Sequence, residues 1–115
     1  MTTYTPDRWV VLELTNDEHG KIRKVLAGWH GGYLNGDSWK MNSGITETVE
    51  TDEYFDFHGY SGSVYRCYKH NYGMNMYMSS ILAQMQDIIA ATPSNSIEIV
   101  PDYDQEKKHV PIRNL

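Results

Sequence analysis

The spacing between apolar residues changes near Met74, and this change limits the possible fold more than any other feature of the chain. Before Met74, apolar and polar residues alternate in short runs, which is typical of strands. After it, they recur at helical intervals, which is typical of a helix with one buried stripe. The sequence therefore predicts an α+β fold, a twisted antiparallel sheet of about five or six strands with one C-terminal amphipathic helix packed on it.

The first two predicted strands, Arg8–Thr15 and Lys21–Trp29, enclose the turn cluster Asn16–Gly20 and predict a β-hairpin. Alternation along the first strand puts Val10, Leu12 and Leu14 on one face, and Trp9, Val11 and Glu13 on the other. Shorter strands are expected at Ser38–Asn42, Ile45–Thr51, Tyr54–His58, Ser63–Lys69 and Ser96–Val100, with a tight turn at residues 51–53.

The predicted helix covers residues 75–91. Either Asn75 or Asn71 is suited to cap its start, because a short side-chain oxygen can accept from the first free backbone N–H groups. Pro93 lies just beyond its end. The expected buried stripe consists of Met78, Ile81, Leu82, Met85, Ile88 and Ile89.

Length and composition describe a single domain over residues 1–115. Of the 115 residues, 40% are hydrophobic and 22% are charged, as in an ordinary globular protein. Met74 and Met76 lie off the helix stripe and indicate a second contact such as a dimer interface. The polar tail, residues 101–115, is expected to be loosely held or to lie between subunits, so the sequence favours a homo-oligomer.

Charge and cysteine content exclude several classes of protein. Ten Lys and Arg against 15 Asp and Glu give a net charge of −5, which argues against avid nucleic-acid binding. Cys67 is the single cysteine, so no intrachain disulfide can form and a reducing cytoplasm is the expected location. The N-terminal residues lack the pattern of a secretory signal, and no apolar run approaches the ~20 residues of a membrane span, so no membrane contact is expected.

No pattern of residues in the sequence identifies a reaction or a metal site. The five histidines show no close pairing of the kind that zinc sites use, so neither a metal nor another cofactor is expected. The stretch Gly59–Ser63 nearly matches the nucleophile elbow G-x-S-x-G, but the chain is short for the hydrolase fold that carries this motif. A tight turn is the simpler interpretation, and no catalytic residue is assigned. Cys67 is assigned to packing.

Two segments combine the residue types of a ligand site. The first, Ala27–Asn42 (AGWHGGYLNGDSWKMN), holds two tryptophans, a tyrosine and four glycines, and the second, His58–Lys69, again alternates glycine, serine, aromatic and basic residues. Aromatic faces suit a base, and serine, glycine amides, arginine and lysine suit a phosphate. The predicted ligand-binding residues are Trp29, Gly31, Gly32, Tyr33, Asp37, Ser38, Trp39, Asn42, Tyr60, Ser61, Ser63, Arg66 and Lys69.

This site requires both segments to face the same cavity. The alternative is a structural corner, in which Trp29 and Trp39 are large core residues and the glycines are bends. Both interpretations are compatible with the residues alone.

The runs TPDRWVVLEL, KVLAGWHGGYLNGDSWKMNSGI, YSGSVYRCYK and YGMNMY resemble a family of small uncharacterised proteins encoded by tailed bacteriophages. The resemblance covers most of residues 5–80 and brings no catalytic residues with it. It implies a compact phage accessory protein in the cytoplasm of an infected bacterium. Small phage proteins of that kind inhibit host enzymes or sequester the nucleotide signals of bacterial immunity.

The expected function is therefore a binding protein that sequesters a small nucleotide-like ligand, such as an immune signalling molecule, in counter-defence. One alternative is a protein–protein interaction module or an inhibitor of a host protein. A small hydrolase that uses Ser61 or a histidine is the least favoured alternative.

Overall fold

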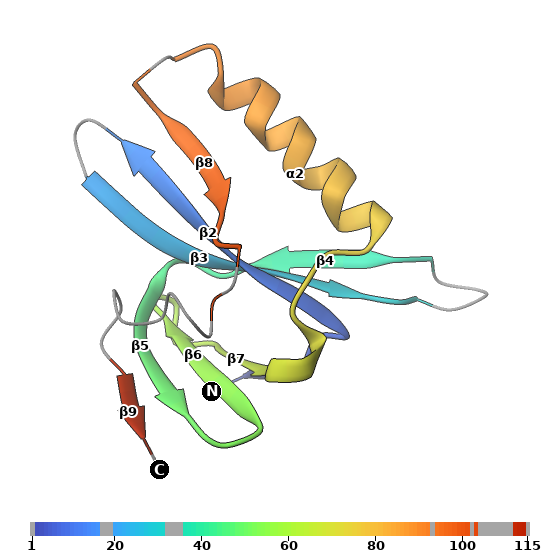
Figure 1. Cartoon of the computed structure of the whole chain (residues 1–115), viewed down its shortest axis with the longest axis vertical. Coiled ribbons are helices and arrows are strands. Elements are labelled where there is room, and N and C mark those ends of the chain that lie inside the picture. The colour runs from blue at the N-terminus through green and yellow to red at the C-terminus, as the bar shows by residue number, and fades with distance from the viewer. Residues whose placement is uncertain are drawn as a thin grey trace.

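The computed structural model describes residues 2–16, 20–31, 36–92, 94–101, 103 and 112–114. The described strands are β1 (Thr3–Tyr4), β2 (Arg8–Asn16), β3 (Gly20–Trp29), β4 (Ser38–Met41), β5 (Ile45–Glu50), β6 (Tyr54–Gly59), β7 (Val64–Tyr68), β8 (Ser96–Ile99) and β9 (Ile112–Asn114). The 3₁₀ turn η1 (Lys69–Asn71) and the helix α2 (Met76–Ile89) lie between β7 and β8 (Figure 1).

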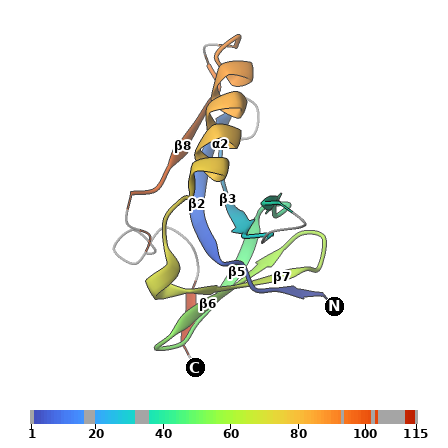
Figure 2. The ribbon, with the colours of Figure 1, turned by 90° about the vertical axis from the view of Figure 1, so that its right-hand side faces the viewer.

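The α+β class is confirmed, but the prediction of a single antiparallel sheet was wrong, because the strands form two sheets. Sheet A has the strand order β1-β7-β6-β5-β9, and sheet B has the order β4-β3-β2-β8. Sheet A also contains two parallel pairs, β1 with β7 and β5 with β9. Figure 2 shows α2 lying along β2 and β3 of sheet B, with β5, β6 and β7 of sheet A below them.

Strand β2 explains the second sheet, because both of its faces are apolar and both are buried. Trp9 and Val11 belong to a core cluster shared with Phe55 and Phe57 of sheet A. On the other face, Val10 and Leu12 belong to a cluster with Met78 and Leu82 of α2. The predicted division of this strand into two faces is confirmed. A strand that is apolar on both faces needs cover on both sides, so sheet B lies between α2 and sheet A.

The predicted hairpin is also confirmed, with β2 and β3 paired in register from Arg8 opposite Gly28 to Asn16 opposite Gly20. Gly20 adopts φ 71°, a left-handed conformation that glycine enters without a steric penalty. The predicted tight turn at residues 51–53 is present, because the backbone N–H of Thr51 donates to the carbonyl of Tyr54 at 2.9 Å.

Helix α2 begins and ends close to its predicted bounds. Asn75 caps it, since its side-chain oxygen accepts from the backbone N–H of Met78 at 2.8 Å. Met78 and Leu82 are buried against sheet B, as expected. The assignment of Ile88 to the buried stripe was wrong, because this side chain is 76% exposed. At 3.6 residues per turn it lies about 80° around the helix from Met78, at the margin of the stripe.

Candidate functional site

Three of the predicted ligand residues, Trp29, Ser38 and Trp39, line one surface hollow of about 440 Å³. We call this site the aromatic hollow; its lining is completed by Thr3, Tyr4, Thr5 and Lys40. The pairing of β3 with β4 brings the three predicted residues together, because Trp29 lies opposite Ser38. The indole N–H of Trp29 donates to the carbonyl of Thr5 at 3.0 Å, which ties the segment around β1 to sheet B at this point.

The chemistry of the aromatic hollow combines rings, hydroxyls and one cation. The rings of Tyr4 and Trp29 meet edge to face, with centroids 6.2 Å apart and an interplanar angle of 71°. The ammonium of Lys40 lies 5.3 Å from the centroid of the Tyr4 ring. None of the seven lining residues that the structure describes is acidic. The site can therefore offer stacking surface, hydroxyl donors and a positive charge to a ligand.

The remaining predicted residues of the first segment have other positions. Gly31 approaches the backbone of Gly36 so closely that a β-carbon on Gly31 would come 1.1 Å from the Gly36 carbonyl oxygen. This close approach shows a structural reason for glycine at position 31. Asp37 is exposed. Gly32 and Tyr33 lie outside the described residues.

Asn42 is a buried residue that joins two elements. Its side-chain oxygen accepts from the backbone N–H of Val25 at 2.8 Å, and its own backbone N–H donates to the Val25 carbonyl at 3.1 Å. Only 4% of Asn42 is exposed. These bonds extend the β3–β4 ladder by one step as the chain leaves sheet B for β5, so Asn42 has a structural task in this fold.

Ser61 and Ser63 belong to the turn between β6 and β7. The backbone N–H of Gly59 donates to the Ser63 carbonyl at 3.1 Å, and the N–H of Ser61 donates to the hydroxyl of Ser43 at 3.0 Å. The turn joins two antiparallel strands. A nucleophile elbow requires a strand-to-helix turn, so this geometry matches the interpretation of Gly59–Ser63 as a tight turn.

Arg66 lies on the face of sheet A that points away from sheet B, because its neighbours Tyr65 and Cys67 point into the core. Its guanidinium donates to both carboxylate oxygens of Asp56, at 2.9 and 3.0 Å, and stacks 4.3 Å from the centroid of Tyr54. The hydrogen bond with Asp56 raises the pKa of Arg66.

Lys69 is likewise engaged within the fold. Its ammonium lies 2.5 Å from the carboxylate of Glu50 and 5.0 Å from the centroid of Phe55. Arg66 and Lys69 therefore both neutralise carboxylates of sheet A, and neither lines the aromatic hollow. The structure does not assemble all the predicted residues around one cavity.

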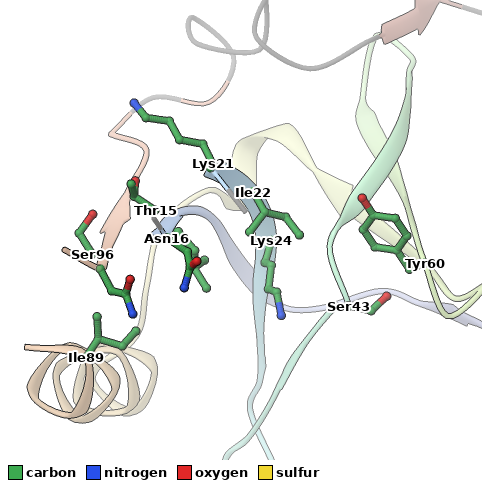
Figure 3. A pocket seen from close by; sticks show the side chains of 12 residues that line it. Thr15, Asn16, Lys21, Ile22, Lys24, Ser43, Tyr60, Ile89 and Ser96 are labelled. Atoms are coloured by element: carbon green, nitrogen blue, oxygen red, sulfur yellow. The ribbon is translucent and has the colours of Figure 1, made fainter. Parts of the chain in front are cut away.

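A second and larger depression, which we call the hairpin groove, has a volume of about 520 Å³. It is lined by Leu14, Thr15, Asn16, Gly20, Lys21, Ile22, Lys24, Ser43, Tyr60, Ile89, Asn95 and Ser96. Figure 3 shows Lys24 between Ile89 on one side and Ser43 and Tyr60 on the other. Of the described lining residues, Tyr60 alone was among the predicted ligand residues. The alternation of residues 21–29 places Lys24 on the same face as Ile22 and Leu26, but it gives no signal for the lining residues from other elements.

Glycine at position 44 lets Ile22 and Tyr60 meet at one side of this groove. Gly44 has φ 130°, and a β-carbon there would come 2.8 Å from both Ile22 Cδ1 and Tyr60 Cε2. The ring of Tyr60 is therefore seated against the backbone, although the residue as a whole is 70% exposed.

Within the described ranges, no group of three or more His, Cys, Asp or Glu side chains could hold a metal ion. In the same part of the chain, no helix is long and apolar enough to cross a membrane. No protein-family model matches the chain, and neither the curated proteins nor the solved structures include a significant match to it. The aromatic hollow and the hairpin groove are therefore the candidate functional sites of the described structure.

Proposed function

We propose that this protein is a binding protein that captures a small nucleotide-like ligand in the aromatic hollow. One observation carries the proposal. In a chain with a net charge of −5, the described lining of this hollow combines three aromatic side chains, three Ser or Thr hydroxyls and an ammonium group, and it includes no acidic side chain. An anion meets no carboxylate of this described lining, and the aromatic rings offer a planar base a surface on which to stack.

Each part of the lining has a role in this proposal. The Trp29 indole is held by Thr5 and so offers a fixed surface to a base. The ammonium of Lys40 pairs with a phosphate; among the described residues it has no carboxylate partner. The hydroxyls of Thr3, Thr5 and Ser38 bond to a ribose or to phosphate oxygens.

Calorimetric titration tests this function with a panel of nucleoside monophosphates, cyclic nucleotides and ADP-ribose at low ionic strength. At least one member is expected to bind with one-to-one stoichiometry, and Lys40→Met is expected to weaken its binding by about fivefold to thirtyfold. Lys24→Met, which changes the same residue type in the hairpin groove, is the matched control and is expected to bind normally. Absence of binding across the panel, or equal losses in both variants, would contradict the proposal.

The biological setting is part of the proposal. The resemblance to small tailed-phage proteins suggests that the protein acts in the cytoplasm of an infected bacterium, where sequestering a nucleotide signal of host immunity would be counter-defence. A plaque assay on a host that carries nucleotide-signalling immunity tests this. Wild-type protein should restore plating of a sensitive phage, and Lys40→Met should not.

The exposed apolar residues of α2 favour a second candidate, a protein–protein interaction module. Met76 is 90% exposed, Ile88 is 76% exposed and Tyr77 is 37% exposed. Such side chains bury readily against a host protein or another copy of the chain. Sedimentation of wild-type protein and of Met76→Ser/Ile88→Ser tests the homo-oligomer form of this candidate; a change from oligomer to monomer would support it.

A further inference from the structure

Lys24 occupies an unusual position in sheet B, because it projects from the apolar face that packs against α2. It lies opposite Leu12 in the β2–β3 ladder, with Ile22 and Leu26 on the same face of β3. Leu12 and Leu26 are fully buried in the cluster beneath α2. The residue itself is half-buried. Its stem therefore runs over apolar surface while its ammonium reaches the hairpin groove.

The ammonium of Lys24 has no carboxylate partner among the described residues. The neighbouring lysine behaves differently: Lys21 lies 3.4 Å from the carboxylate of Glu13 and is 68% exposed. Figure 3 shows these two side chains extending in different directions from β3. The ammonium of Lys24 therefore reaches the groove without a described carboxylate beside it, and it offers its positive charge to an anion from solvent.

The other residues of the groove indicate the chemistry of the part of the ligand that carries the anionic group. Leu14, Ile22 and Ile89 supply apolar surface from β2, β3 and the C-terminal end of α2. Tyr60 closes the opposite side with its ring (Figure 3). The volume of about 520 Å³ lies within the usual range for small-molecule sites. None of the twelve described lining residues is acidic.

We propose that the hairpin groove binds an amphipathic monoanion, a carboxylate or sulfonate attached to a compact apolar ring system or short chain, with Lys24 as its counter-charge. The anionic group pairs with the Lys24 ammonium. The apolar body lies on the surface formed by Leu14, Ile22 and Ile89, and the Tyr60 ring borders that surface on the side away from Ile89 (Figure 3). This site is separate from the aromatic hollow, since the two linings share no residue.

Two fluorescent probes with the same apolar body test the proposal. Anilinonaphthalene sulfonate carries a negative charge, and N-phenyl-1-naphthylamine does not. The folded wild-type protein is expected to bind the sulfonate more tightly than the neutral probe, at one site, and to lose that preference as salt is raised.

Lys24→Met keeps the apolar stem and removes the charge. It is expected to weaken sulfonate binding by about fivefold to thirtyfold and to leave binding of the neutral probe unchanged. Lys40→Met, which changes the same residue type outside this groove, is the matched control and is expected to bind both probes like wild type. Tyr60→Ser is expected to weaken both probes.

Equal affinity for the two probes, an unchanged sulfonate affinity in Lys24→Met, or the same loss in Lys40→Met would overturn the proposal. Near-ultraviolet circular dichroism of each variant confirms that the probe reports a folded protein. Nucleotide binding in the aromatic hollow is tested separately with Lys40→Met. Either proposal can therefore fail without affecting the test of the other.

Discussion

Met78 of α2 lies directly over Gly28 of β3, so that a β-carbon on Gly28 would come 2.4 Å from the Met78 Sδ atom. Within sheet B, Gly28 is paired with Arg8 of β2 on one side and with Trp39 of β4 on the other. The absence of a side chain at Gly28, within the segment Ala27–Asn42, therefore allows α2 to pack closely on sheet B. Its neighbour Trp29 points to the other face and lines the aromatic hollow.

Gly28→Ala is expected to destabilise the fold by about 1–3 kcal/mol, because the added methyl group overpacks the contact with α2. Urea unfolding followed by circular dichroism measures the change. In a Met78→Ala background the same substitution should cost much less, since the clashing thioether is gone. An equal cost in both backgrounds would show that Met78 is not the source of the strain.

Asn42→Ala is expected to lower the free energy of unfolding by about 1–3 kcal/mol, because it leaves the buried N–H of Val25 without its acceptor. Ser43→Ala, at an exposed neighbouring position, is the control and is expected to change stability by much less. If Asn42 were instead a ligand contact, the substitution would reduce nucleotide affinity while stability stayed at the wild-type value.

Cys67 is expected to resist thiol reagents in the folded protein. It is fully buried in the core between the sheets, and burial raises the pKa of its thiol well above the ordinary value. Ellman's reagent at mildly alkaline pH should react only after guanidinium unfolds the chain. Rapid stoichiometric reaction under native conditions would contradict the packing around this residue.

Glu13 is expected to make stability depend on pH in the acid range. Burial by itself would raise the pKa of Glu13, but hydrogen bonds from Arg23 and Lys21 outweigh it and hold the pKa below the ordinary value of 4.5. A carboxyl with a lowered folded-state pKa stabilises the fold above its unfolded pKa, and this contribution disappears as pH falls through the folded pKa.

Glu13→Gln should therefore be less stable than wild type near neutral pH, by up to about 1 kcal/mol. The difference should shrink between about pH 5 and pH 3. Urea midpoints across this range measure it, and exposed Glu53→Gln serves as the control. A difference that stays constant down to pH 3 would show that the charge of Glu13 is not what stabilises this cluster.

The local elements of the fold could be predicted because they follow from periodicity within short segments. The β2–β3 hairpin, the short strands and the Asn75 cap of α2 all have local signals. The second sheet could not be predicted this way, because it depends on which strands pair across the chain. One indication was present in β2, where Trp9 and Val11 make the second face apolar as well. The sequence does not show, however, that other strands form a separate sheet over that face.

The candidate site was predicted in part for the same reason. The cross-strand pair of Trp29 and Ser38 lies within a single local segment, so composition was enough to indicate it. Arg66 and Lys69 looked available for a ligand because the sequence does not show that strand pairing in sheet A places Asp56 and Glu50 beside them. Lys24 was overlooked since the sequence does not show that its neighbours on the same face are buried beneath a helix.

Titration of nucleotide into ¹⁵N-labelled protein, followed by the indole N–H resonances of its three tryptophans, tests the central claim most directly. The Trp29 indole lies at the aromatic hollow, whereas the Trp9 indole is buried and donates to the Tyr68 carbonyl at 2.7 Å. The account predicts a saturable shift of the Trp29 resonance with the Trp9 resonance unmoved. Unchanged resonances throughout the nucleotide panel, or equal movement of Trp9 and Trp29, would contradict it.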